Sequence, residues 1–198
     1  MIEILLVILI SYLTGSIPTG YIIVKAKTGD DLTKLGSGST GATNVKRVLG
    51  KKWFFIVLLL DALKGALPVI LATYFTTFAS DIGLMPVIAS VMVLIGHSKS
   101  IFLKFKGGKS VASGVGTILA LNWAVGLIIA AIWACITYFS KYVSVGSIIA
   151  LSISPFVMYY FKSPIAYVVY CAVGALYIIW LHRENIKRLI NGVENKVR

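Results

Sequence analysis

The chain has 198 residues, of which 58% are hydrophobic and 13% charged, and its mean hydropathy is +0.91. Soluble globular domains are usually about half apolar. This composition therefore excludes a soluble globular protein and indicates an integral membrane protein. The formal net charge of +12 would favour a nucleic-acid partner only in a soluble chain, so we expect no nucleic acid to bind.

Six apolar runs follow one another along the chain, at residues 4–24, 53–79, 84–95, 111–139, 143–161 and 165–181. We expect the first run to be a kinked spanning helix, because Pro18 lies near its end between Gly15 and Gly20. The kink should pack against protein, since backbone groups freed from a helix cannot be left facing lipid.

Lysine and arginine are concentrated in three segments, which predicts the side of the membrane for each. Residues 25–52 contain seven, residues 97–110 four and residues 182–198 five of the 19 in the chain. By the positive-inside rule, all three segments should be cytoplasmic. Two runs separate the first segment from the second, which places the short loop around Asp81 and Gly83 outside. Three runs separate the second from the third, which would leave the cationic tail outside.

An even number of crossings results if the run 111–139 breaks near Asn122 and Trp123. The two halves are then about 11 and about 16 residues long, short for a hydrocarbon core that needs about 20. We therefore expect an all-α integral membrane protein with seven transmembrane helices, its N-terminus outside and its C-terminus cytoplasmic. The alternative has five spanning helices and two segments that enter and leave without crossing. Residues 1–198 should form a single multi-span domain.

The first polar segment, residues 36–52, has the composition of an anion site. Glycines let the backbone bring its N–H groups close to an anion, and nearby hydroxyl groups add donors. These residues are Gly36, Gly38 and Gly41, with Ser37, Thr40 and Thr43. Arg47 adds a planar fork suited to phosphate. The alternative is a flexible cytosolic loop whose lysines only set the topology.

The second polar segment, residues 96–116, contains Gly107, Gly108, Lys109 and Ser110 directly before an apolar run. Its glycines would present N–H groups at a helix N-terminus with Lys109 beside them, which favours an anion. The segment is not a P-loop, because position 103 is leucine where that pattern requires glycine. Attraction to anionic membrane lipids is enough to explain Lys99 and Lys104.

The tail, residues 182–198, begins with His182 and Asn185, which are three residues apart and share a helical face. The apolar residues that follow at helical spacing predict an amphipathic helix along the membrane surface; they are Ile186, Leu189, Ile190 and Val193. A lone histidine at a membrane boundary is usually a polar anchor. The case for a catalytic role of His182 strengthens if the other two polar segments lie next to it.

Asp61 and Lys64 lie three residues apart inside the second apolar run. Charged groups at such depth are costly and normally pair, so we expect a structural ion pair that braces the polar loops. Cys135 and Cys171 fall in apolar runs without the spacing of metal ligands, which favours packing over metal or redox chemistry.

Four stretches together resemble one known family: GSGSTGATNVKRVLG at 36–50, DALKG at 61–65, GHSKSIFLKFKGGKSVASGVG at 96–116 and HRENIKRLI at 182–190. In order and spacing they are similar to the bacterial acyl-phosphate-dependent glycerol-3-phosphate acyltransferases, over nearly the whole chain. The chain departs from the family pattern at Ser39, where asparagine is usual, and after Gly96-His97, where more apolar residues are usual.

The resemblance implies transfer of a fatty acyl group from acyl phosphate, a lipid donor, to the 1-hydroxyl of the soluble acceptor glycerol 3-phosphate. The products would be 1-acylglycerol 3-phosphate (lysophosphatidate) and phosphate, in the first acylation of phospholipid synthesis. It also implies a multi-pass protein of the bacterial cytoplasmic (inner) membrane, surrounded by membrane lipids, with its active site on the cytoplasmic face. No cofactor is expected.

Taken with this resemblance, the residue patterns predict the site. The catalytic residues are expected to be Ser37, Arg47, Lys109, His182 and Asn185. Phosphate is expected to bind Gly36, Gly38, Gly41, Thr43, Asn44, Gly107, Gly108 and Ser110. We expect direct acyl transfer without a metal ion, the proton passing to His182 or to an oxygen of the donor phosphate. His97 is expected to be structural, and residues 16–20 to form one wall of an acyl-chain groove.

Two other classes of function remain open at this stage. A small membrane transporter of phosphate esters or anions would also gather cations and broken helices, but no internal repeat is visible. A structural lipid-binding subunit would explain the surface lysines but not three glycine, serine and asparagine clusters. A donor bound as a soluble thioester is disfavoured, because the histidines lack the aspartate of the HxxxxD motif; Phe102 and Lys187 stand at those positions.

Overall fold

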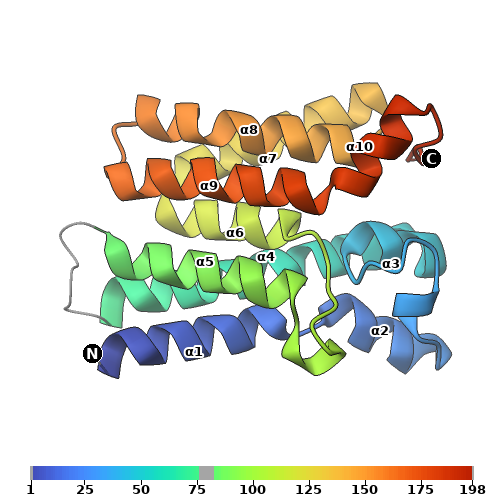
Figure 1. The fold of residues 1–198 in the computed structure, drawn as a ribbon, viewed down its shortest axis with the longest axis horizontal. Coiled ribbons are helices and arrows are strands. Elements are labelled where there is room, and N and C mark those ends of the chain that lie inside the picture. Colours follow the sequence, from blue (N-terminus) through green and yellow to red (C-terminus); the bar gives the residue numbers. More distant parts are fainter. Residues whose placement is uncertain (1, 76–82, 198) are drawn as a thin grey trace. The chain divides into compact units, whose positions relative to one another are not determined.

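A computed structural model describes residues 2–75 and 83–197, and within them it contains ten α-helices and no β-strand (Figure 1). The helices are α1 Ile2–Ser16, α2 Thr19–Thr28, α3 Ala42–Leu49, α4 Lys51–Phe75, α5 Leu84–Ser98, α6 Val111–Leu121, α7 Trp123–Ser140, α8 Val143–Tyr160, α9 Ile165–Leu181 and α10 Arg183–Ile190. Two short 3-10 helices are also described: η1 Leu32–Lys34 lies just before the first polar segment, and η3 Ile101–Leu103 lies in the second. The prediction of an all-α protein is confirmed.

Within the described residues, four helical stretches are long and apolar enough to cross a membrane, and a fifth is added if the bent pair α9 and α10 counts as one. The four are Ile2–Thr28, Lys51–Tyr74, Trp123–Ser140 and Val143–Tyr160. Helices α5 and α6 are apolar but shorter. The end of the predicted run 53–79 and the loop around Asp81 lie outside the described residues.

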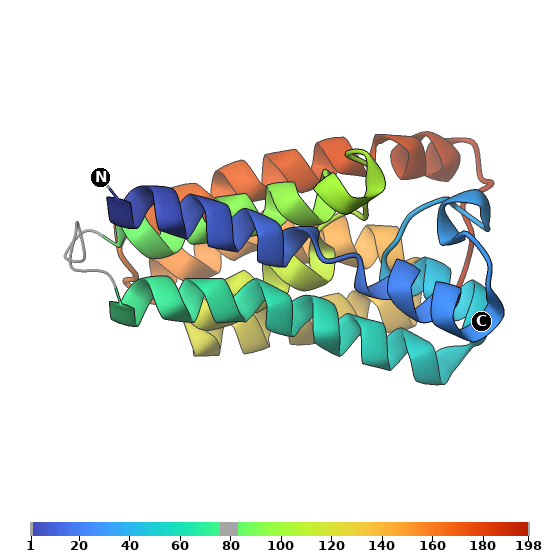
Figure 2. The ribbon, with the colours of Figure 1, turned by 90° about the horizontal axis from the view of Figure 1, so that it is seen from below.

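The contacts between residues divide the chain into two compact units, Met1–Thr117 (unit 1) and Ile118–Arg198 (unit 2). In unit 1, α1 packs along α5, and α4 packs against α5, α1 and α3 (Figures 1 and 2). Glycines permit the close crossing of α1 and α5, since a Cβ on Gly15 would lie 2.6 Å from the carbonyl oxygen of Val93. At one end of this unit, Val24, Leu32, Val45 and Val57 form an apolar core beneath the first polar segment.

The predicted kink in the first span is confirmed, because α1 ends at Ser16 and α2 begins at Thr19. The break frees carbonyl oxygens that lipid could not satisfy. The Ser16 oxygen accepts a 2.6 Å hydrogen bond from Oγ of Ser100, and the Ile17 oxygen accepts one of 2.6 Å from Nζ of Lys64. Protein groups therefore cover the break.

The predicted break at Asn122 is also confirmed. Asn122 separates α6 from α7, and its Oδ1 accepts hydrogen bonds from the N–H groups of Ala124 (3.2 Å) and Val125 (3.3 Å) at the start of α7. Its Nδ2 donates to Oγ of Ser163 at 3.0 Å. The asparagine thus caps one helix and ties it to the loop between α8 and α9.

In unit 2, α8 packs between α7 and α9. The chain bends by 59° where α9 passes into α10, which can be followed in Figure 1. The predicted tail helix is confirmed over Arg183–Ile190, although Val193 follows its end rather than forming part of it. The tail then returns to the start of α8, where the N–H of Val197 donates to the carbonyl oxygen of Lys141 at 2.8 Å.

Candidate active site

Asn44 organises the first polar segment from inside. It is 1% exposed, and its Oδ1 accepts a 3.0 Å hydrogen bond from the N–H of Ser37. Its Nδ2 donates to the carbonyl oxygens of Leu35 and Ser39, each at 2.9 Å. Since both ends of the amide are engaged by the segment's own backbone, Asn44 shapes the loop. Its predicted contact with phosphate stays a prediction.

The exposed rim of this loop carries the residues suited to an anion. Gly36 and Gly38 have φ angles of +56° and +69°, which glycine adopts most readily, and a Cβ on Gly36 would collide with Oδ1 of Asn44. The side chain of Arg47 passes beside Gly36, with its Cδ 3.7 Å from the position of such a Cβ. Ser37 and Arg47 are both exposed. An arginine fork and a turn of backbone are therefore next to each other.

The remaining residues of the first polar segment lie where α3 begins. Gly41 is the residue before the helix and has no side-chain cap, and Thr43 lies in the first turn. A helix N-terminus offers N–H groups to an anion. The substituted Ser39 accepts a 3.4 Å hydrogen bond from Gly41 through its Oγ, so it serves the turn.

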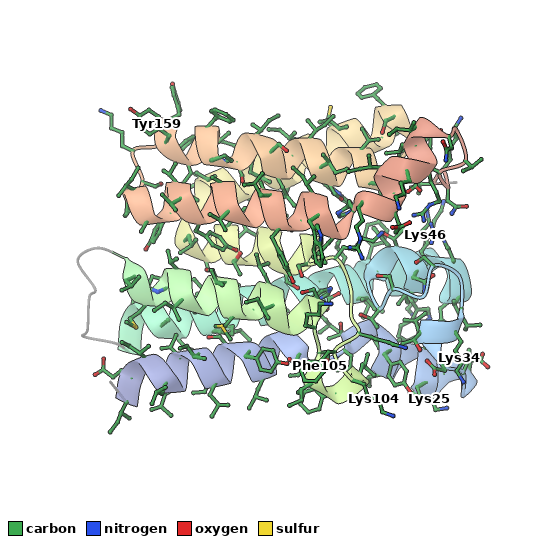
Figure 3. All side chains as sticks on the ribbon, viewed as in Figure 1. Lys25, Lys34, Lys46, Lys104, Phe105 and Tyr159 are labelled. Atoms are coloured by element: carbon green, nitrogen blue, oxygen red, sulfur yellow. The ribbon has the colours of Figure 1, made fainter. Side chains whose placement is uncertain are left out.

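The second polar segment leaves α5 as a tight hairpin. Ser100 and Lys106 pair across it, and Lys104 and Phe105 have φ angles of 52° and 60°. Figure 3 labels Lys104 and Phe105 on this hairpin, at the same end of unit 1 as Lys25 and Lys34. The two cationic segments of unit 1 thus lie at one end of it, as the charge pattern predicts.

The glycine loop, residues 106–110, follows this hairpin and leads into α6. Gly107 and Gly108 lie against His97, and Lys109 is half-buried. Ser110 is fully buried and its Oγ donates a 2.8 Å hydrogen bond to the carbonyl oxygen of Leu94. The Ser110 hydroxyl therefore fastens the loop to α5, and its predicted contact with phosphate stays a prediction.

The predicted ion pair is confirmed. Nζ of Lys64 lies 2.8 Å from Oδ1 of Asp61, and the two side chains are 7% and 1% exposed. Lys64 also covers the break between α1 and α2, as described above. The pair braces the helices of unit 1 from within.

The two predicted site residues of the tail, His182 and Asn185, lie in unit 2 and are buried. His182 is 3% exposed, and its Nδ1 lies 2.8 Å from the carbonyl oxygen of Ile178. Nδ2 of Asn185 donates a 2.6 Å hydrogen bond to Oε1 of Glu194. Both side chains are thus held in fixed directions at the start of α10.

Glu194 was missed by sequence reasoning. Besides Asn185, its carboxylate accepts hydrogen bonds from Nε of Arg188 (2.7 Å) and Oγ of Ser144 (3.0 Å). Burial acts to raise the pKa of Glu194, but the hydrogen bonds from Asn185, Arg188 and Ser144 outweigh it and lower the pKa. The tail holds only two carboxylates, Glu184 and Glu194, among five basic residues, and this is the signal that could have found it.

Ser37, Arg47 and Lys109 thus belong to unit 1, and His182 and Asn185 to unit 2. Among the residues that the structure describes, no three His, Cys, Asp or Glu side chains gather as a metal site would require.

The model of a family described as glycerol-3-phosphate acyltransferase matches residues 5–192. The chain belongs to this family. A glycerol-3-phosphate acyltransferase of Nostoc sp. (strain PCC 7120 / SAG 25.82 / UTEX 2576) is 45% identical over 204 residues, covering 96% of this chain and 90% of the relative. One of Prochlorococcus marinus (strain MIT 9312) is 43% identical over 195 residues, covering 98% and 97%.

Two solved structures are also similar. The crystal structure of PlsY (YgiH), an integral membrane glycerol 3-phosphate acyltransferase, in its glycerol 3-phosphate form has a TM-score of 0.92 and 35% identity, covering 98% of this chain and 96% of that one. Its lysophosphatidic acid form has a TM-score of 0.90 and 34% identity, covering 98% and 95%. The family resemblance stated from the motifs is confirmed.

Proposed function

We propose that the protein transfers a fatty acyl group from acyl phosphate to the 1-hydroxyl of glycerol 3-phosphate, giving 1-acylglycerol 3-phosphate and phosphate. The observation that carries the proposal is the similarity, over 98% of the chain, to an integral membrane acyltransferase solved in its glycerol 3-phosphate form. The acyl-phosphate donor is supported by the motifs and by the missing HxxxxD pattern. Membrane lipids would surround the enzyme. Its site would lie at the membrane surface, since one substrate is a lipid and the other is soluble.

In this proposal Arg47 and Lys109 hold the phosphate groups of the two substrates. Arg47 lies on the exposed rim beside Gly36, and Lys109 directly follows the glycine pair. The N–H of Gly108 already donates to the carbonyl oxygen of His97, so Gly108 would shape the loop rather than bind phosphate through that N–H. Charge-assisted contacts of this kind are individually strong and stabilise both the oxyanion and the departing phosphate. The shape of both loops is supplied by buried groups, Asn44 in the first and Ser110 in the second.

The transfer itself would be direct. The 1-hydroxyl oxygen attacks the acyl carbonyl carbon, the bond from that carbon to the bridging phosphate oxygen breaks, and phosphate leaves. The hydroxyl proton passes to the imidazole of His182 or to an oxygen of the donor phosphate, and Asn185 orients the substrate. An acyl phosphate is already an activated mixed anhydride, so positioning and charge stabilisation are the main tasks.

We also propose that the chain is a single domain with seven transmembrane helices, N-terminus outside and C-terminus cytoplasmic, in the bacterial inner membrane. The break at Asn122 supports this, because it supplies the extra crossing that puts all three cationic segments on the cytoplasmic face. Cysteines introduced near Asn122 should react with an impermeant reagent only from outside. Labelling from the cytoplasm would favour the five-span alternative.

Reconstitution tests the activity. Purified protein in a bilayer mimic should convert acyl phosphate and glycerol 3-phosphate to the lysophosphatidate, and should not accept the same chain as a soluble thioester. Lys109→Ala should lose most of the activity while keeping its melting temperature. Phosphate release without the ester product would contradict the proposal, and uptake of the phosphate ester into vesicles would favour the transporter.

A further inference from the structure

The glycine loop lies directly on His97. The N–H of Gly108 donates a 3.1 Å hydrogen bond to the carbonyl oxygen of His97. A Cβ on Gly107 would collide with the same oxygen, and a Cβ on Gly108 would collide with Nε2 of the imidazole ring. Only glycine allows so close an approach. The position of His97 therefore decides where the loop lies.

The imidazole ring of His97 is held from its other side. Its Nδ1 lies 3.0 Å from Oγ of Ser113, in the first turn of α6, and 3.7 Å from Oδ1 of Asp61 in α4. His97 is 6% exposed and Ser113 is fully buried. The ring of His97 in α5 thus contacts both Gly108 in the glycine loop and Ser113 in α6, the helix into which this loop leads.

Asp61 is fixed in turn by groups from other elements. Its Oδ1 accepts a 2.5 Å hydrogen bond from Oγ1 of Thr19 and pairs with Lys64 at 2.8 Å. Gly65, one residue beyond Lys64, packs on the backbone of Ser113 without room for a Cβ. A continuous buried polar network thus runs from the break between α1 and α2, through α4, to the glycine loop. Buried charges are costly, so we expect such a network to have a defined structural or functional role.

We propose that His97 is a positioning residue, which together with Ser113 holds the glycine loop where its Lys109 meets the substrate phosphate. This inference rests on the proposed function, in which Lys109 binds that phosphate. His97 acts through the loop because its ring is buried and Gly108 covers Nε2. A displacement of about 1 Å at such a site can lower the rate about 100-fold, so a small shift of the loop is enough.

The test compares two serine variants of the full-length protein in detergent or nanodiscs. Ser113→Ala removes the hydroxyl that contacts Nδ1 of His97, and it leaves no large cavity because only one oxygen atom is lost. Ser90→Ala is the matched control, because Ser90 is equally buried, and its Oγ bonds only within α5, to the carbonyl oxygen of Pro86 at 2.7 Å. Lys109→Arg is measured alongside, to identify the substrate whose KM depends on the loop.

We expect Ser113→Ala to raise, about 5-fold to 10-fold, the KM of the same substrate that Lys109→Arg affects, with the other KM unchanged. Ser90→Ala should change neither, and both serine variants should melt within a few degrees of the parent. His97→Ala should have a larger effect, partly restored in His97→Asn, whose amide can still reach Ser113. If His97→Ala does not fold, Ser113→Ala decides alone.

Different failures have different meanings. If Lys109→Arg raises one KM but Ser113→Ala leaves it unchanged, the positioning role of His97 is wrong and the proposed site stands. If Ser113→Ala and Ser90→Ala lower activity equally, or both KM values rise together, the network is merely structural and the inference is likewise wrong. If Lys109→Arg changes no kinetic constant, the phosphate role of the loop fails, and this inference fails with it.

Discussion

Asn185 donates a 2.6 Å hydrogen bond through Nδ2 to the carboxylate of Glu194, which lies nine residues later in the chain. The bond fixes the direction of the Asn185 side chain. Because Arg188 and Ser144 donate to the same carboxylate, the tail is folded back onto α8 around one negative charge. The orientation of a predicted site residue thus depends on a carboxylate outside the predicted site.

Glu194→Gln should lower activity about 10-fold and lower the melting temperature, since charge-assisted hydrogen bonds are about twice as strong as neutral ones. Glu184→Gln is the control, because Glu184 makes only exposed ion pairs with Arg183 and Lys187, which contribute little. Comparable losses in the two variants would show that the buried carboxylate has no special role.

The parent protein and Glu194→Gln should also differ in how their melting temperatures depend on pH. The pKa of Glu194 in the folded protein is below its ordinary value of 4.5, so the carboxylate stabilises the fold fully above that value. The stabilisation is lost as the pH falls below 4.5 through the lower folded pKa. Melting temperatures should therefore differ by a constant amount between pH 8 and about pH 5.5 and converge in acid. A difference that grows in acid would mean that the pKa of Glu194 is raised.

Arg47→Ala should lower kcat/KM by about 100-fold or more, since a donor aimed at developing charge contributes a few kcal/mol to the transition state. Arg47→Lys should recover little, because an ammonium group cannot make two parallel hydrogen bonds to phosphate. The exposed Lys52 lies in the same segment, and Lys52→Ala controls for the general loss of positive charge. Full activity in Arg47→Lys would show that only charge is needed.

Gly20 packs against the first polar segment. A Cβ there would collide with the carbonyl oxygen of Thr40 and lie 2.9 Å from Cγ2 of Val45. The Cβ position of Gly20 thus faces the first polar segment, and the prediction that residues 16–20 form one wall of an acyl-chain groove stays a prediction. Gly20→Val should shift that loop and lower the rate equally for every chain length. Ala26→Val, at an exposed position of α2, should have no effect. Altered chain preference in Gly20→Val alone would show instead that Gly20 lines the acyl-chain groove.

Chelators should leave the rate unchanged if the transfer needs no metal ion. A single-turnover reaction with labelled acyl phosphate should form product with no prior burst of acylated protein, since the activated donor makes a protein nucleophile unnecessary. Trapping an acyl-serine, acyl-cysteine or acyl-histidine that reacts with glycerol 3-phosphate at a competent rate would overturn direct transfer.

The sequence by itself determined the apolar helices, two of their breaks, the tail helix and the family, but not the short helix α3 in the first polar segment. Apolar length and desolvation are properties of a local stretch, so the break at Asn122, the kink at Pro18 and the pairing of Asp61 with Lys64 could all be predicted. The glycine pair before Val111 and the fork of Arg47 were likewise visible as chemistry suited to phosphate. The motif order was enough to identify the family.

Only the tertiary structure decided which polar groups face inward. Asn44 could have pointed to solvent, but it bonds to Leu35, Ser37 and Ser39 across its own loop. His97 lies beneath Gly108 because α4, α5 and α6 pack closely, and no spacing along the chain encodes that packing. A buried polar group must find a partner within about 3 Å, and that partner is chosen by how the helices cross, which sequence periodicity leaves undetermined.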